Sequence, residues 1–177
     1  MPRNDRRGSG ASLATRLLVL FLLAAGWAVG GTARAASGQP LPRFVSLKAD
    51  KVNVRSGPSR DHEITWVFTR VALPVEITAE SENWRRIRDA EGAEGWVYHS
   101  LLSSRRTVLV TPWSKNETFA LYVRPDKSAR IVAEMQSGVL GLVRNCDGKW
   151  CRIFGEGFDG YIEQERLWGV YPNESVE

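Results

Sequence analysis

The chain carries WRRIR at residues 84–88 and GWV at 95–97, and the pattern returns as WCRIF at 150–154 and GYI at 160–162. The two leading tryptophans are 66 residues apart and the two glycines are 65 apart. An internal repeat of this length is the sequence sign of a duplicated structural unit. We therefore expect two small domains of one kind.

The residues around the repeat have the character of strands and turns. Short runs rich in Val, Ile, Thr and aromatic residues are cut by Gly, Pro, Asn and Asp, and no long segment has the 3.6-residue period of a helix. The pattern predicts an all-β fold with one short helical turn near 163–168. In the first unit we expect strands near 44–49, 52–56, 64–70, 74–80, 84–89, 94–98 and 106–111. In the second unit we expect strands near 119–123, 139–143, 150–153 and 158–162.

The first 35 residues have the order of a secretory signal peptide. A start with four arginines is followed by the uncharged apolar run LLVLFLLAAGWAVGG at 17–31 and then by Ala33-Arg34-Ala35, a small-x-small cleavage pattern. The run has 15 residues, fewer than the roughly 20 that cross a bilayer as a helix. An uncleaved membrane anchor is the alternative. We expect an exported protein, periplasmic or secreted, without stable membrane insertion after cleavage.

Removal of this segment changes the charge of the chain. The full sequence has 24 basic and 20 acidic residues, and five of the basic and one of the acidic residues lie in 1–35, which leaves 19 of each. Binding to nucleic acid or to an anionic membrane needs concentrated positive charge. The mature chain offers none, so neither partner is expected.

The mature chain divides at a stretch that breaks the strand pattern, 112–118. We expect a lead-in at 36–43, a first domain at 44–111, a linker at 112–118, a second domain at 119–171 and a loose tail at 172–177. Domains of about 60 residues bury a limited share of their surface and are marginally stable alone. Six of the seven tryptophans lie after residue 36, and each can bury a large area in a small core.

The two cysteines, Cys146 and Cys151, flank a four-residue loop. In an antiparallel hairpin this spacing places them opposite each other, and export favours their oxidation to a disulfide. Free core thiols and a redox pair are the alternatives, although the spacing is not the C-x-x-C of oxidoreductases.

The stretch VNVRSGPS at 52–59 resembles the opening of bacterial SH3-like (SH3b) domains. Members of that family continue with a hydrophobic strand, a W-x-x-[IV] strand and a late G-W-V, which residues 84–87 and 95–97 match. The second unit is a weaker copy, with Tyr122 in the place of the asparagine and Tyr161 in that of the G-W-V tryptophan. The resemblance implies two small SH3-like β-barrels in tandem over roughly 44–171.

Five residues are candidates for ligand contact. Asn53 and Arg55 share one face of their strand, while the valines beside them face the other way. For Trp66, Tyr98 and Trp113 the sequence leaves two roles possible, packing in the core and contact with a ligand. Trp84 and Trp150, in the middle of hairpin strands, are expected to fill the cores.

No catalytic set is visible in the sequence. His62 and His99 lack metal-ligand spacing, no histidine follows His99 to serve a Cys-His nucleophile, and no Gly-rich phosphate loop is present. We expect no cofactor, no metal and no enzymatic activity. An undetected enzyme would need a deep polar cleft with perturbed carboxylates.

Two functions follow from this interpretation. The first is a non-catalytic envelope protein that recognises peptidoglycan peptide through the SH3b-like barrels. The alternative is a periplasmic adaptor that binds another envelope protein and has no cell-wall ligand.

Overall fold

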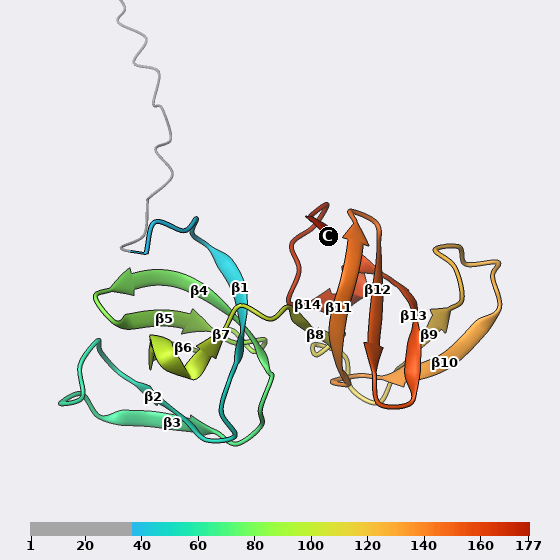
Figure 1. Ribbon diagram of the computed structural model, residues 1–177. Helices are drawn as coiled ribbons and strands as arrows, with labels where there is room; N and C mark the ends of the chain where they lie inside the picture. The colour runs from blue at the N-terminus through green and yellow to red at the C-terminus, as the bar shows by residue number, and fades with distance from the viewer. Residues whose placement is uncertain (1–36) are drawn as a thin grey trace, which may run out of the picture. The chain divides into compact units, whose positions relative to one another are not determined.

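The computed structural model describes residues 37–177. The expected signal peptide, 1–35, lies outside the described residues. Within the described part, no helix has the length and apolar character needed to cross a membrane. The described residues form part of a single compact unit and are almost entirely β (Figure 1).

The first sheet has seven antiparallel strands in the order β3-β2-β6-β5-β4-β1-β7. It curls on itself, as its ribbon shows (Figure 1). A 3₁₀ turn, His99–Leu101, joins β6 to β7. The strands are β1 (Arg43–Leu47), β2 (Val52–Arg55), β3 (Ile64–Phe68), β4 (Pro74–Ser81), β5 (Trp84–Arg88), β6 (Glu94–Tyr98) and β7 (Leu102–Ser103).

The second sheet is also antiparallel and curled. Its strand order is β10-β9-β13-β12-β11-β8-β14, and β15 adds to β11. The 3₁₀ turn Gln164–Arg166 precedes β14 and lies within the helical turn expected near 163–168. The strands are β8 (Thr107–Val110), β9 (Thr118–Tyr122), β10 (Ile131–Gln136), β11 (Leu140–Asp147), β12 (Trp150–Gly155), β13 (Phe158–Glu163), β14 (Leu167–Trp168) and β15 (Ser175–Val176).

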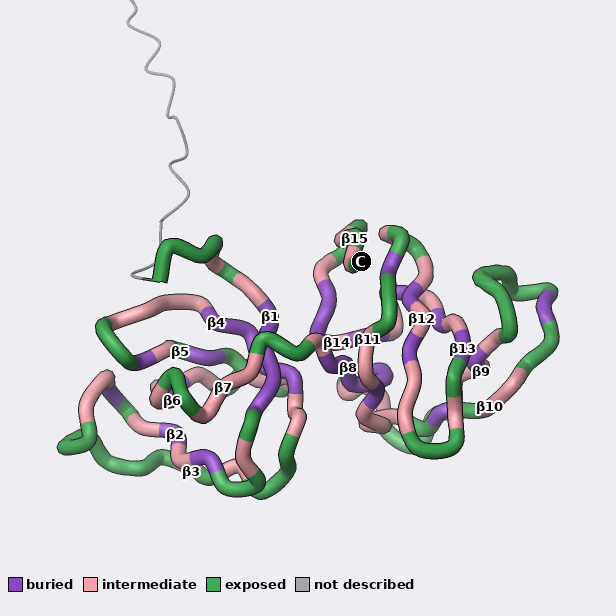
Figure 2. The backbone as a smooth tube through the Cα atoms, viewed as in Figure 1, coloured by how far each residue is buried: buried purple, intermediate pink, exposed green. Residues whose placement is uncertain are grey.

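Alternating apolar residues build each core. Val52 and Val54 of β2 and Ile87 of β5 are fully buried in the first sheet, and Leu121 and Ile153 are their counterparts in the second. Figure 2 shows the buried stretches within the strands and the exposed residues mainly in the turns. The predicted fold class, two small SH3-like β-barrels in tandem, is confirmed.

The tryptophans of the repeat do not fill these cores. Trp84 is buried and Trp150 is half-buried, but neither belongs to the apolar clusters at the barrel centres, whose buried members include no aromatic residue. Each instead packs edge-to-face on a tyrosine, Trp84 on Tyr98 and Trp150 on Tyr122. The expectation that they are core residues is therefore only partly met.

Four segments differ from the sequence expectation. The strand expected at 106–111, placed in the first unit, is β8, and it pairs with β11 and β14 of the second sheet. Its valines, Val108 and Val110, are fully buried in the second core, which explains why the strand belongs to the second barrel. The expected loose tail contains β15, which pairs with β11. Strands β7 and β10 were not foreseen.

Polar and aromatic contacts join the two barrels. The indole N–H of Trp168 donates to the carbonyl oxygen of Pro74 at 3.1 Å, and the Tyr171 hydroxyl donates to Glu76 at 2.9 Å. Phe44 packs on the rings of Trp168 and Tyr171, with centroid distances of 5.0 and 4.7 Å. These contacts explain why Glu76, only 6% exposed, is tolerated at a buried strand position.

Candidate functional site

A groove on the first barrel brings together three of the five candidate ligand residues. Asn53, Arg55 and Tyr98 line a cavity of about 270 Å³, which we call the first groove. Its other lining residues are Arg60, Trp84, Ser100 and Leu101. Whether these residues bind a ligand stays a prediction.

The strand geometry explains this convergence. Val52 and Val54 enter the core, so Asn53 and Arg55 face the other side of β2. Tyr98 is the cross-strand partner of Trp84, and the two rings meet edge-to-face at 5.4 Å and 81°, a favourable aromatic geometry. The aromatic pair therefore lies beside the polar residues of β2.

The first groove is positively charged. Arg55 donates to the carbonyl oxygen of His62 at 2.5 Å. Neither Arg55 nor Arg60 forms an ion pair with an acidic residue among residues 37–177, and no carboxylate lines the groove. Two guanidinium groups without a carboxylate partner favour a ligand that carries a carboxylate or a similar planar anion.

A larger groove occupies the equivalent position on the second barrel. It has a volume of about 660 Å³, and we call it the second groove. Trp150 pairs with Glu163 as Trp84 pairs with Tyr98, so the glutamate takes the place of the tyrosine. The lining residues are Trp113, Lys127, Gly148, Lys149, Trp150, Glu163, Gln164, Glu165, Leu167, Trp168, Val170, Pro172 and Asn173.

The pairing also corrects the alignment of the two repeats. Tyr122 pairs with Tyr161 as Arg55 pairs with Trp96. Tyr122 therefore stands in the place of Arg55, and not in that of Asn53 as its sequence position suggested. The second barrel has consequently replaced a groove arginine with an aromatic ring, which packs on Trp150 at 5.7 Å and 86°.

The remaining two candidates lie apart from the first groove. Trp113 is 58% exposed and lines the second groove. Trp66 packs against the first core and meets Phe68 edge-to-face at 6.0 Å. It lines a separate cavity of about 300 Å³, to which Leu109 of β8 also contributes. The five candidates are thus divided among three places.

Sequence reasoning missed the charged loop residues of both grooves. Arg60 lies five residues after the end of β2, and Lys127 lies five residues after the end of β9. This shared distance of five residues could have indicated Arg60 and Lys127 as groove residues, but it can be measured only when the ends of both strands are known.

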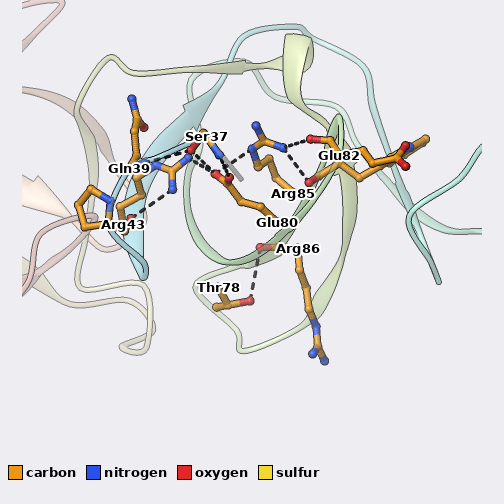
Figure 3. Close-up of polar contacts among 10 residues, drawn as sticks. Ser37, Gln39, Arg43, Thr78, Glu80, Glu82, Arg85 and Arg86 are labelled. Carbon is orange, nitrogen blue, oxygen red and sulfur yellow. Dashed lines mark hydrogen bonds and ion pairs between the residues drawn. The ribbon is translucent and has the colours of Figure 1, made fainter. Parts of the chain in front are cut away.

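A buried carboxylate lies outside both grooves, near the start of the described chain (Figure 3). The Glu80 side chain is fully buried, and its carboxylate accepts hydrogen bonds from the backbone N–H and hydroxyl of Ser37, at 2.8 and 2.9 Å. Arg43 and Arg85 approach it at 2.5 and 3.0 Å. Burial alone would raise the pKa of Glu80, but the hydrogen bonds from Arg43 and Ser37 hold that pKa below its ordinary value. This cluster ties residue 37 to the first barrel.

The predicted disulfide is present. Cys146 and Cys151 are cross-strand partners in the β11–β12 hairpin and are bonded to each other. Asp147 caps the turn by accepting hydrogen bonds from the backbone N–H groups of Lys149 and Trp150, both at 2.8 Å. These bonds hold the pKa of Asp147 below its ordinary value. The disulfide is in the second barrel and lies next to the second groove.

The residues that the structure describes show no cluster of three or more His, Cys, Asp or Glu side chains that could hold a metal ion. His99 packs on Tyr98 at 5.0 Å, and the ring of His62 packs against Gly57. Both histidines therefore have structural neighbours. The lining residues of the two grooves are mainly charged, amide-bearing and aromatic.

Three comparisons place the chain among known proteins. The model of the bacterial SH3 domain matches twice, at residues 48–104 and 115–169. A search of curated proteins finds no match. Two similar solved structures are those of NlpC2 and NlpC1 from Trichomonas vaginalis, each 18% identical, with TM-scores of 0.32 and 0.33. The alignments cover 72% and 75% of this chain, which spans about half, 48%, of either of those chains.

The two family matches together account for more than half of the sequence, and each covers most of the strands of one of the barrels described above. The chain therefore belongs to the bacterial SH3 domain family and carries this domain twice in tandem.

Proposed function

We propose that this protein is a non-catalytic binding protein of the bacterial envelope, periplasmic or secreted, and that its first groove recognises the peptide of peptidoglycan. The observation that carries the proposal is the convergence of Asn53, Arg55, Arg60 and Tyr98 on one groove without an acidic lining residue.

The chemistry of the first groove fits an acidic extended peptide. Peptidoglycan stem peptides carry free carboxylates, which a guanidinium group binds with paired hydrogen bonds. The Asn53 amide can donate to and accept from a peptide main chain. The Tyr98 ring, fixed against Trp84, offers a flat apolar surface beside these groups.

A pull-down with purified sacculi tests the proposal. We expect the exported protein to sediment with sacculi at low salt and the double variant Arg55→Gln/Arg60→Gln to lose at least about tenfold in affinity. The double variant Arg105→Gln/Arg130→Gln removes the same charge from exposed positions outside the groove and should bind as the original protein does. The proposal fails if the original protein stays in the supernatant at low salt.

One observation favours the alternative function, a protein-interaction adaptor. Strand β3 is an edge of the first sheet, and Ile64, Val67 and Val71 on or beside it are 46%, 38% and 49% exposed. An apolar edge strand is a template for pairing with a strand of another protein. Crosslinking in the periplasm from position 67 would identify such a partner, and Ile64→Lys on the same edge strand should abolish the crosslink.

A further inference from the structure

We propose that the second groove is a separate binding site for a neutral glycan, a chain of β-1,4-linked pyranose sugars. The inference goes beyond the peptide site of the first barrel, because it concerns another groove and another class of ligand. It rests on the aromatic lining, the balance of charge, one buried polar group and the origin of the groove walls.

Three tryptophans line the second groove. The Trp168 indole N–H is already bonded to Pro74, and Trp150 is fixed against Tyr122, so both rings are held in place. Trp113 is 58% exposed, and a large apolar ring left in water beside a concave site is typical of a binding surface. β-linked pyranoses present axial C–H groups on their faces, which pack on aromatic rings.

The charges of the second groove cancel. The Lys127 ammonium meets the Glu163 carboxylate at 2.5 Å. The lining also holds Lys149 and Glu165, which bring the formal count to two lysines and two glutamates, although the ion-pair partner of Glu165 is Arg166 at 3.9 Å. A groove without net charge has no preference for an ionic ligand, whereas its carboxylates and amides can hydrogen-bond to hydroxyl groups. The balance therefore favours a neutral polyhydroxylated ligand over the acidic peptide proposed for the first groove.

Gln164 supplies an acceptor without a partner. The residue is part of the groove lining and is only 4% exposed. The Nε2 group donates to the carbonyl oxygens of Tyr171 and Glu174, at 2.6 and 3.0 Å, which fixes the orientation of the amide. The Oε1 atom has no hydrogen-bond partner among residues 37–177. Oε1 is itself shielded from solvent, so a ligand hydroxyl reaches it only if the groove lining shifts on binding, and pairing it then removes the cost of a buried unpaired acceptor.

Part of the groove wall comes from segments outside the domain that the family shares. Trp113 precedes the second family match, and Val170, Pro172 and Asn173 follow it. These segments help to make the groove more than twice as large as its counterpart on the first barrel. The site is therefore a feature of this chain and does not follow from the barrel fold alone.

The test uses the exported protein and a tetramer of β-1,4-linked N-acetylglucosamine as the probe. The indole N–H signals of the tryptophans are followed by NMR during the titration. We expect saturable shifts of the Trp113 and Trp150 signals. Trp113→Ala should weaken binding by about tenfold or more, and Trp113→Phe, which keeps an aromatic face, should retain most of the affinity. Because Trp113 is exposed, neither variant should lower the melting temperature.

Two controls separate this site from the first groove. Arg55→Gln/Arg60→Gln should leave the affinity for the glycan unchanged, even if it abolishes binding to sacculi. Conversely, failure of the sacculus experiment leaves the glycan titration interpretable. The proposal is overturned if the tetramer gives no saturable shift at millimolar concentration, or if Trp113→Ala binds it as the original protein does. It is also overturned if an acidic tetrapeptide, and not the glycan, shifts the Trp113 signal.

Discussion

The first and second barrels place a tryptophan at equivalent positions, Trp84 and Trp150, and surround it with different groups. On the first barrel the neighbours are Tyr98 and two arginines without carboxylate partners. On the second, Glu163 stands in the place of Tyr98 and pairs with Lys127. The strands hold the tryptophan in both cases, while strand ends and loops set the charge. A duplicated barrel can thus present two kinds of groove without changing its ladder of strands.

The interactions that stabilise the two barrels outside their cores differ as well. The first barrel has the buried Glu80 cluster near its amino-terminal end, and the second has a disulfide in its central hairpin. Both cores, in contrast, consist mainly of Val, Leu and Ile. The comparison predicts that substitutions in the two cores lower the stability of the barrels equally, whereas loss of the Glu80 cluster or of the disulfide lowers the stability of one barrel only.

Truncation of the core isoleucines should have the largest effect. Ile87 and Ile153 are equivalent and fully buried. Each Ile→Ala change should lower the free energy of unfolding by about 2–5 kcal/mol, since it removes buried methyl groups and leaves a cavity. Urea unfolding followed by tryptophan fluorescence measures the loss. A loss below about 1 kcal/mol in one barrel only would show that the two cores are not equivalent.

Glu80→Gln should destabilise the first barrel next most strongly, by about 1.5–3 kcal/mol at pH 7, because charge-assisted hydrogen bonds are lost. The folded-state pKa of Glu80 lies below its ordinary value of 4.5. Its stabilising contribution is therefore complete well above pH 4.5 and is lost as the pH falls through the folded-state pKa. Urea unfolding at several pH values should show the variant and the original protein converging in acid. A gap that is independent of pH would contradict this account.

Removal of the disulfide should affect the second barrel alone. Replacement of Cys146 and Cys151 by serine should cost about 2 kcal/mol, the chain-entropy value for so short a loop. Amide hydrogen exchange should become faster in β11 and β12 and stay unchanged in β2 and β6. Reduction of the original protein by a thiol should reproduce the effect. Two reactive thiols in the unfolded, unreduced protein would show that the bond does not form.

The smallest expected effect concerns the contact between the barrels. Burial, followed by the hydrogen bond to Glu76, raises the pKa of Tyr171. Tyr171→Phe removes this bond but leaves the Arg88–Glu76 pair at 3.2 Å, so a loss of about 1 kcal/mol is expected. The amide signals of β4 in the first barrel should shift although the substitution is in the second. Shifts confined to the second barrel would argue against the contact.

The sequence predicts the parts of this structure that depend on local pattern. Alternation identifies most strands, the spacing of Cys146 and Cys151 identifies the disulfide, and the face shared by Asn53 and Arg55 identifies one wall of the first groove. Each of these features is decided within a few residues of the chain. The structure agrees on all three.

Features that depend on distant partners could not be predicted in this way. The pattern of β8 indicates a strand but not which sheet it joins, because its partners, β11 and β14, lie 30 or more residues later. Trp66 lies in an expected strand and Trp113 in the expected linker, but neither position shows what the ring contacts. Only the fold shows that Trp66 packs on the first core and that Trp113 lies beside the carboxyl-terminal segment.

The position of β8 bears on how the second barrel can be inherited. The two family matches leave residues 105–114 between them, and β8 (Thr107–Val110) lies in this gap. A recombination event that moved residues 115–169 alone would deliver a sheet without the strand between β11 and β14. A gene segment that is copied or shuffled must therefore begin upstream of the codon for Thr107 to encode the intact second sheet. That start lies outside both family matches, in the stretch between them.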